Sequence, residues 1–457
     1  MTKNIHEFTV RSELRDSPTM SEGPKARAAW EKLGKNGIEL TLGDLFPKPT
    51  QTEIDGWMAS LVADAKKANP ADPKYSLLRD EKKLYAYSTT DAMESFRITA
   101  AECFTRDTGI AVGKEYVAAG CGGKGALNGG LSKFKAGDVV FVGAPGWPTN
   151  YDMFPAGVKL VEIATKDGLL RADDVVAALA KYPNPAGILI NAPCNPTGAN
   201  YTRAEREAFF AAVAQHTTST TVLSDNPYGK LVFDQEPYDI RSVLQRGPAE
   251  RALFDQGRLA CFQTVSKEYG LAGERVGWMV TKDKEMLSSC KRWNEKVGGI
   301  GKRNQLLAQA ALIYGDSFIE RTVGELTEKR KLLVDGIGAL QYAEMKTPQA
   351  TIYGWVDFAP LKGLSVLASV SETGEAYTID SPAAMKRYLI NVAGICGVPG
   401  APFYAPDSAS AADEWHMRIS FCCETEQLKS ALHQLAEAEG KLVNSHAKSL
   451  LERGGGE

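Results

Sequence analysis

Lys267 and Arg275 stand eight residues apart in a segment rich in small residues, 264–277. A lysine amine can condense with an aldehyde to form a Schiff base. An arginine, together with a hydroxyl such as that of Thr264, can hold a phosphate group. Most lysines are solvated surface charges, so this segment alone does not identify a catalytic site. The fold has to bring other candidate residues to Lys267.

Three such candidates, Asn195, Asp225 and Tyr228, follow short apolar runs in the middle of the chain. An amide, a carboxylate and a phenol placed together can set the protonation state of a bound ring. Asn-Pro-Thr-Gly and Asp-Asn-Pro are also common turn sequences, so each motif has a purely structural explanation as well.

The apolar runs are short, continuous and bounded by turn residues, which indicates buried strands of a mainly parallel sheet. Residues 203–215 carry Phe209, Phe210 and Val213 at helical spacing between two of these runs, which predicts a βαβ unit. Ligands of such a sheet gather beyond the carboxyl ends of its strands, where the candidate residues stand. The expected strands are 139–142, 187–190, 221–223, 259–263 and 276–280.

Further candidates come from a glycine run, a tryptophan and an arginine. Gly123 and Lys124 precede an expected helix, where backbone N–H groups favour an anion. Trp147 follows a strand and can stack on a flat ring. Arg418 opens a later strand and can bind a carboxylate with two parallel hydrogen bonds. Glycine runs also mark turns, tryptophans also fill cores, and arginines at strand ends are usually solvated.

The pattern changes after about residue 315 to that of a second, α+β domain. We expect the loop 361–380 either to cover the site or to lie on the surface. The two ends, 1–15 and 454–457, are expected to be disordered. Along this second part we expect a charged helix at 319–340, strands at 351–358 and 417–421, and a terminal helix at 425–452.

Composition excludes several classes of protein. A length of 457 residues favours two domains. The 53 Lys and Arg against 56 Asp and Glu form no basic block, which argues against nucleic acid or an anionic membrane as partner. The eight cysteines are scattered and the five histidines form no ligand pattern, so we expect neither a disulfide framework nor a metal site. With no apolar signal or membrane-spanning run, the sequence predicts a cytoplasmic protein.

Together, these motifs resemble those of the fold type I, pyridoxal-phosphate-dependent class I aminotransferases, an aspartate aminotransferase-like family, over nearly the whole chain. The resemblance implies an α/β fold, in which a mainly parallel, seven-stranded-type sheet is sandwiched by helices, with a smaller α+β domain. We expect residues 46–320 to form the large cofactor-binding domain and residues 1–45 and 321–457 to form the small domain.

The resemblance also implies roles for single residues. Lys267 would form the Schiff base with pyridoxal 5'-phosphate and move the proton at the substrate Cα. Asp225 would keep the pyridine nitrogen protonated, and Tyr228 would act with it at the ring. The implied cofactor-binding residues are Gly123, Lys124, Trp147, Asn195, Asp225, Tyr228, Thr264, Lys267, Arg275 and Tyr87. The implied substrate-binding residues are Gly43, Trp147, Asn195 and Arg418.

Tyr87 matches a tyrosine that reaches the partner's cofactor in this family, which implies a homodimer with shared active sites. Aspartate-specific relatives also carry an arginine that crosses the dimer to bind a side-chain carboxylate. No arginine stands at that position here. Lys296, Lys302 and Arg303 are the candidates to replace it, or the substrate is not dicarboxylic.

The sequence therefore predicts an aminotransferase that moves an amino group between an L-amino acid, with aspartate and glutamate as candidates, and a 2-oxo acid. A pyridoxal-phosphate-dependent decarboxylase, β-lyase or oxidase on the same scaffold is the main alternative, because motifs around the ring do not decide which Cα bond breaks. A non-catalytic cofactor-binding sensor is a weaker alternative, because the first forty residues lack a basic helix-turn-helix pattern.

Overall fold

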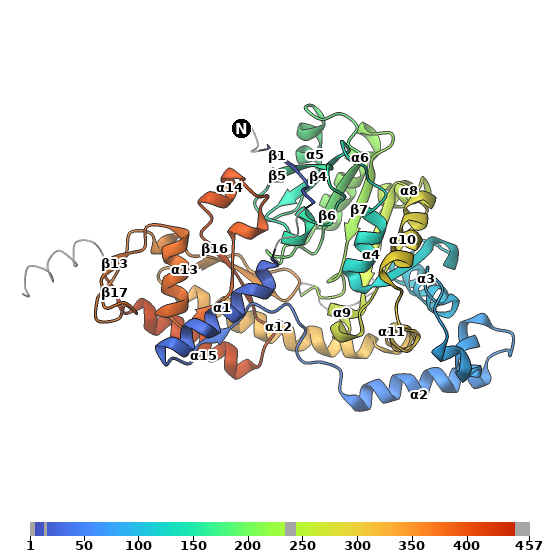
Figure 1. Cartoon of the computed structure of the whole chain (residues 1–457), viewed down its shortest axis with the longest axis horizontal. Coiled ribbons are helices and arrows are strands. Elements are labelled where there is room, and N and C mark those ends of the chain that lie inside the picture. Colours follow the sequence, from blue (N-terminus) through green and yellow to red (C-terminus); the bar gives the residue numbers. More distant parts are fainter. Residues whose placement is uncertain (1–4, 13–15, 234–243, 444–457) are drawn as a thin grey trace, which may run out of the picture.

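A central sheet with helices on both faces forms the larger part of the molecule (Figure 1). The structure is a computed structural model, and it describes residues 5–12, 16–233 and 244–443. The sheet has eight strands, in the spatial order β1 (Ile5–Thr9), β5 (Lys159–Ala164), β4 (Val139–Ala144), β6 (Gly187–Asn191), β7 (Thr221–Asp225), β8 (Leu259–Thr264), β9 (Val276–Thr281) and β3 (Val117–Cys121). Strands β5, β4, β6, β7 and β8 run parallel, whereas β1 and β9 are antiparallel to their neighbours.

Side chains alternate between the two faces of this sheet, as the pleat of a strand requires. In β4, Val140 and Val142 pack on one side, and Phe141 packs on the other. The first side is covered by α4 (Gly122–Leu131) and α10 (Lys284–Val297). The second is covered by α3 (Glu94–Thr108), α5 (Ala172–Leu179), α6 (Arg203–His216), α8 (Pro248–Asp255) and α11 (Lys302–Tyr314). The predicted α/β sandwich is confirmed.

Local sequence signals explain where the core elements begin. Helix α6 starts at a capping box, in which the Thr202 hydroxyl accepts from the Glu205 backbone N–H at 3.2 Å and the Glu205 carboxylate accepts from the Thr202 backbone N–H at 2.9 Å. Its four buried residues include Phe209, Phe210 and Val213, the three that predicted it. The five predicted strands are also confirmed, as β4, β6, β7, β8 and β9.

The smaller part of the molecule is built around a four-stranded antiparallel sheet, which confirms the predicted α+β character (Figure 1). The long helix α12 (Asp316–Gly338) leads into it from the large sheet. The strands of this sheet, in spatial order, are β10 (Glu344–Met345), β11 (Tyr353–Asp357), β16 (His416–Ser420) and β15 (Val398–Pro399). Around it lie α1 (Pro18–Leu33), α13 (Pro382–Asn391), α15 (Thr425–Glu439) and the pair β2 (Ile38–Glu39) and β14 (Ile395–Cys396).

The remaining elements are short or peripheral. Helix α2 (Gln51–Lys67) extends along the bottom of the molecule in Figure 1. Two helices of four residues each among the described residues are α9 (Val265–Glu268) and α14 (Ala409–Ala412). The 3₁₀ turns are η1 (Pro73–Arg79), η2 (Glu81–Tyr85), η3 (Lys114–Tyr116), η4 (Pro148–Tyr151), η5 (Ala272–Glu274), η6 (Ala359–Leu361) and η7 (Ala401–Phe403). No helix within the described ranges is long and apolar enough to cross a membrane.

Two expectations about the C-terminal part need correction. The predicted helix 425–452 ends at Glu439, and the chain then forms β17 (Leu442–Val443). The loop 361–380 contains β12 (Ser365–Val366) and β13 (Tyr377–Thr378), and β12 pairs with both β13 and β17. These strands lie at the far end of the smaller part (Figure 1), which places the loop away from the active-site cavity described below. Residues 444–457, with the predicted disordered end, lie outside the described residues.

The N-terminus also differs from expectation. Residues 5–9 were expected to be disordered and to belong to the small domain, but they form β1 and pair along their full length with β5. The edge of β5 offers unpaired backbone groups, and β1 satisfies them. Residues 1–4 and 13–15 lie outside the described residues.

Glu162 on β5 ties the large sheet to the segment 403–408 of the C-terminal part. Its buried carboxylate accepts hydrogen bonds from Tyr151 Oη at 2.7 Å, from Ser408 Oγ at 2.7 Å and from the backbone N–H of Ala405. Two of these three donors, Ala405 and Ser408, belong to the segment, so the buried carboxylate fixes its position against the sheet.

Replacing this carboxylate tests the link. We expect Glu162→Ala to lower the free energy of unfolding by about 3 kcal/mol, because three buried donors lose their acceptor. Urea denaturation followed by circular dichroism measures the change. Glu7→Ala, on an exposed face of β1, is the control and should change stability by less than about 0.5 kcal/mol. Equal stability of both variants would contradict the assigned role.

Candidate active site

One cavity of about 550 Å³ lies at the carboxyl ends of the central strands and gathers nearly all the residues that the sequence singled out. It is bordered by the ends of β6, β7 and β8, by the start of α4 and by β16 of the smaller part. The predicted residues that line it are Gly43, Gly123, Lys124, Trp147, Asn195, Asp225, Tyr228, Thr264, Lys267, Arg275 and Arg418. Of the predicted site residues, Tyr87 is outside this cavity.

Lys267 enters the cavity from α9, the short helix that follows β8. Thr264 begins this helix, because its hydroxyl accepts from the Ser266 backbone N–H at 3.2 Å. The Lys267 amine donates to the backbone carbonyl of Gly43, in the segment that joins α1 to α2. The nucleophile predicted from sequence therefore lies between the large sheet and the N-terminal segment.

A buried network behind Lys267 fixes the position of α9. Glu268 accepts from the backbone N–H of Lys230 at 2.9 Å, and Lys230 Nζ donates to Tyr269 Oη at 2.8 Å. Lys230 Nζ also lies 3.1 Å from a carboxylate oxygen of Asp107 on α3. Burial raises the pKa of the Glu268 carboxyl to about 7. Since Lys230 follows Tyr228 by two residues, the network joins the Lys267 helix to the loop after β7.

Asp225 ends β7 and is 6% exposed. Its carboxylate accepts from the side-chain amide of Asn191, at the end of the neighbouring β6, at 3.0 Å. Burial raises the pKa of Asp225 to about 7, and the hydrogen bond from Asn191 opposes this shift. A carboxylate in this setting favours a cationic partner.

The glycine run begins α4 and packs against Arg275. Gly122 has a φ of 71°, and a Cβ on it would lie 2.4 Å from Arg275 Nη2. The Gly122 backbone N–H donates to the Arg275 carbonyl at 2.7 Å. A side chain at Gly122 would therefore push the guanidinium away from the helix N-terminus.

Lys124 adds a second cation at this helix start. Its Nζ lies 5.1 Å from the centre of the Trp147 ring, a distance typical of a cation–π contact. Partial burial, followed by repulsion from Arg275 and Lys267, lowers the pKa of Lys124. Three cations thus face one part of the cavity, and an anion placed there would offset their repulsion.

Arg418 reaches the opposite part of the cavity from β16 and is 1% exposed. Its guanidinium donates to Asn195 Oδ1 at 3.0 Å and to the Thr41 carbonyl at 2.7 Å. It also lies 4.1 Å from the centre of the Tyr353 ring. These contacts hold the guanidinium in a fixed orientation, while its Nε has no hydrogen-bond partner among the described residues.

Sequence reasoning missed several residues of this site. Tyr353 on β11 shares a hydrogen bond of 3.0 Å with Tyr228 through their hydroxyls, and Ser266 shares one of 2.8 Å with Thr264. Asn191 is the partner of Asp225. The position of Ser266 next to Lys267 was a usable signal, whereas Tyr353 carried none. The N-terminal segment also lines the cavity, with Ser17, Thr19, Met20 and Leu42.

Tyr87 and the basic candidates near residue 300 lie elsewhere. The Tyr87 side chain is fully exposed, at 102%. Lys302 Nζ donates to the Lys83 carbonyl at 2.6 Å, and Arg303 donates to the Tyr85 hydroxyl at 2.9 Å. Neither these two nor Lys296 lines the cavity of its own chain.

The donor set fits pyridoxal phosphate. Lys124, Lys267 and Arg275 form a cationic region beside the start of α4, which suits a phosphate group. Asp225 is buried with one amide as its side-chain partner among the described residues, which suits a protonated ring nitrogen. The two regions lie in the same cavity as the lysine amine.

Comparison with solved structures defines the class of fold. The aspartate aminotransferase from Rhizobium meliloti aligns with 95% of this chain and 100% of its own, at 22% identity and a TM-score of 0.76. The aspartate aminotransferase from Thermus thermophilus with maleate aligns with 93% of this chain and 97% of its own, at 22% identity and a TM-score of 0.71. The fold is that of the fold type I enzymes.

The chain belongs to the aminotransferase class I and II family, whose model matches residues 55–435. An aspartate aminotransferase from Rhizobium meliloti (strain 1021) is 24% identical over 78% of this chain and 82% of its own length. An aspartate/prephenate aminotransferase from Cereibacter sphaeroides is 26% identical over 76% and 81%. An asparagine–oxo-acid transaminase from Streptococcus mutans is 21% identical over 93% and 96%.

The protein is therefore an aminotransferase, which moves an amino group between an amino acid and a 2-oxo acid. Family membership implies pyridoxal phosphate as the cofactor. The named relatives do not favour the alternatives of a decarboxylase, β-lyase, oxidase or sensor.

The raised pKa of Asp225 predicts a stability effect in the cofactor-free protein. A buried carboxyl that holds its proton up to a pH of about 7 makes unfolding easier as the pH rises from about 4 to about 7, since the unfolded chain releases that proton first. Asp225→Asn removes this dependence. We expect the variant to be more stable than the cofactor-free wild type at pH 8, by roughly 2 to 4 kcal/mol, and to differ little at pH 4.

Thermal unfolding of both cofactor-free proteins between pH 4 and pH 8 measures this effect. Asp55→Asn, on the exposed side of α2, is the control, and its stability relative to the wild type should not change between pH 4 and pH 8. A variant that is less stable than the wild type at pH 8 would contradict the assigned burial of an uncompensated carboxylate.

Proposed function

We propose that this aminotransferase binds pyridoxal phosphate in the active-site cavity and uses Lys267 both as the covalent attachment point and as the proton carrier. The observation that carries the proposal is the convergence of Lys267, Asp225, Arg275 and Arg418 on one cavity. These residues come from separate elements, so a chance meeting of all four is improbable. The resemblance stated from sequence points to the same roles.

Each end of the cavity has a distinct task in this proposal. Gly123, Lys124, Thr264 and Arg275 hold the phosphate group at the start of α4. Asp225 holds the protonated ring nitrogen, and Asn191 keeps the carboxylate in place. When bound, the cofactor supplies an electron-accepting ring that stabilises negative charge at the substrate Cα. Trp147 would stack on the ring, and Tyr228 and Asn195 would hydrogen-bond its phenolic oxygen.

Arg418 and Lys267 act on the substrate. Arg418 binds the α-carboxylate with parallel hydrogen bonds and so fixes the orientation of the Cα–H bond. Lys267 Nζ would take the proton from the substrate Cα and hold it for its return. The contact between the Lys267 amine and the Gly43 carbonyl keeps this nitrogen near the segment that borders the substrate. Gly43 contributes backbone rather than side chain, because a Cβ there would lie 2.0 Å from the Tyr353 hydroxyl.

For the amino donor, we propose an L-amino acid with an uncharged side chain. The cations that line the cavity are already used by the phosphate, the cofactor and the α-carboxylate. The N-terminal wall presents Ser17, Thr19, Met20 and Leu42, which offer hydroxyls and apolar surface. An amide side chain fits this wall better than a second carboxylate, which needs a cation. One relative is named an asparagine–oxo-acid transaminase.

We further propose a homodimer in which Tyr87 reaches the partner's cofactor phosphate. Exposed apolar and aromatic side chains on the large part of the molecule support an interface there. These are Tyr85 at 76%, Tyr87 at 102% and Val297 at 55% exposure. Light scattering of the purified holoenzyme measures the assembly state, and a monomer would overturn this proposal.

The division into domains and the location also stay proposals. We propose that residues 46–320 form the large domain and that the small domain combines residues 321–457 with the N-terminal segment, apart from β1. We propose a cytoplasmic location from the scattered cysteines of the sequence.

Lys267→Ala tests the catalytic assignment. We expect the purified variant to lack covalently attached cofactor and to transfer amino groups about a thousandfold or more slowly, since both the attachment point and the proton carrier are lost. Mass spectrometry after borohydride reduction and a coupled oxo-acid assay measure the two effects. Lys66→Ala, on an exposed face of α2, is the control. A wild-type rate in Lys267→Ala would exclude the assignment.

A half-reaction screen tests the amino donor. Holoenzyme is mixed with asparagine, aspartate or glutamate, and the loss of visible cofactor absorption is followed. We expect a higher kcat/KM for asparagine than for either dicarboxylic amino acid. Met20→Arg adds a cation at the N-terminal wall and should raise kcat/KM for aspartate about tenfold relative to asparagine. A wild-type preference for aspartate would show that a cation from outside this cavity completes the site.

A further inference from the structure

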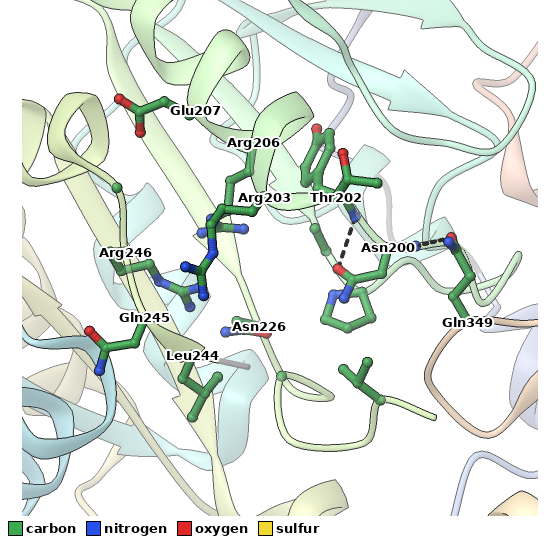
Figure 2. A pocket seen from close by; sticks show the side chains of 16 residues that line it. Asn200, Thr202, Arg203, Arg206, Glu207, Asn226, Leu244, Gln245, Arg246 and Gln349 are labelled. Carbon is green, nitrogen blue, oxygen red and sulfur yellow. Dashed lines mark hydrogen bonds between the residues drawn. The ribbon is translucent and has the colours of Figure 1, made fainter. Parts of the chain in front are cut away.

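A second cavity, of about 340 Å³, is lined by residues next in the chain to those of the active site. Figure 2 shows the side chains that line this cavity. It is bordered by the first turn of α6, by the residues after β6 and β7, and by 244–247. None of its lining residues lines the active-site cavity. Figure 2 shows the side chains of Arg203, Arg206, Arg246 and Asn226 directed toward one space. We call it the arginine cavity.

Among the residues that the structure describes, two arginines in the buried wall of the arginine cavity are paired with one carboxylate. Arg206 binds Glu250 through two hydrogen bonds of 2.7 Å. Arg246 Nε lies 3.3 Å from an oxygen of the same carboxylate. The side chains of Arg206, Arg246 and Glu250 are 13%, 7% and 1% exposed. Two nearly buried guanidinium groups therefore share one carboxylate.

Glu207, the carboxylate that lines the arginine cavity among the described residues, does not pair with these arginines. Glu207 accepts from the backbone N–H of Ala249 at 2.9 Å, and its carboxylate points away from the arginines in Figure 2. Burial, followed by repulsion from Arg206, lowers the pKa of the Arg246 guanidinium. A buried surplus of positive charge is costly unless an anion faces it.

Polar atoms in the wall also lack partners. Among the described residues, Arg246 Nε and Asn226 Oδ1 have no hydrogen-bond partner, although Asn226 is only 5% exposed. The backbone of Arg246 is well fixed, because its N–H donates to Thr108 at 3.2 Å and its carbonyl accepts from Arg251 at 2.9 Å. The guanidinium is thus held at the cavity by its chain while its own hydrogen-bonding capacity is incompletely used.

We propose that the arginine cavity is a binding site for a small anion that carries a carboxylate or phosphate group. Arg246 binds its oxygens through charge-assisted hydrogen bonds, with the Asn226 amide beside it. The backbone N–H groups at the start of α6 contribute a favourable partial charge. This site is separate from the substrate site and does not depend on the proposed roles of Lys267 or Arg418.

The arginine cavity and the active-site cavity are lined by neighbouring residues of the same two loops. Ala192 and Asn226 line the arginine cavity, and their chain neighbours Asn191 and Asp225 line the active-site cavity. The hydrogen bond between Asn191 and Asp225 lies in this shared wall. An anion in the arginine cavity therefore rests against the segments that hold the ring-binding carboxylate.

The test measures anion binding to the holoenzyme. Its cofactor phosphate is proposed to occupy the anion site at the start of α4, so an added anion would not bind there. Isothermal titration calorimetry measures the Kd of inorganic phosphate and, separately, of succinate, at a constant ionic strength set by sodium chloride. We expect at least one of them to bind, and Arg246→Gln to weaken that binding about tenfold. Preference for phosphate or for succinate identifies the group that the cavity accepts. Binding of neither anion overturns the proposal.

Three variants make the result specific. Arg418→Lys is expected to keep the binding, and loss of binding in this variant together with retention in Arg246→Gln would place the anion in the active site and overturn the proposal. Arg321→Gln, in a surface pair with Glu53, controls for a general loss of positive charge. If Arg246→Gln does not fold, Arg246→Lys gives the same test, because it keeps the charge but loses the fork of N–H donors, with an expected loss of about threefold or more.

Discussion

Burial of the Asp225 carboxylate at the end of a central strand is unfavourable unless a cation faces it, and much of the active site follows from this constraint. Asn191 supplies one hydrogen bond at 3.0 Å but no charge. The pKa of about 7 reflects that imbalance. A protonated ring nitrogen would supply the missing positive charge. Burial of the Asp225 carboxylate therefore destabilises the cofactor-free protein and would strengthen cofactor binding. The cofactor-free protein is thus less stable because its site contains a buried carboxylate without a cationic partner.

The parallel sheet concentrates such groups at one edge. Strands β6, β7 and β8 all end at the cavity, and the last residue of each, Asn191, Asp225 and Thr264, is polar and lines it. The buried contacts among Lys230, Glu268 and Tyr269 then join two of these strand ends to one another. Helix α9 has only four residues, so these buried contacts contribute more to the position of Lys267 than the helix itself does.

The two sides of the wall after β6 and β7 differ in charge. On the active-site side, the buried group is the Asp225 carboxylate. On the other side, Arg206 and Arg246 share Glu250 and leave positive charge facing the arginine cavity. Among the described residues, this wall therefore carries an incompletely balanced buried charge on each side, negative at Asp225 and positive at Arg246, and each charge suits a ligand group of opposite sign.

The sequence by itself determined the elements and most of the chemistry. Short continuous apolar runs predicted the five central strands, and the resemblance of the motifs to a known family pointed to Lys267, Asp225 and Arg418. Only the tertiary structure decided which distant residues meet: Tyr353 against Tyr228, Ser408 against Glu162, β1 against β5, and Arg206 against Glu250. Sequence spacing carries no information on such contacts, because they depend on how separately formed elements pack and on which buried charges are left without partners.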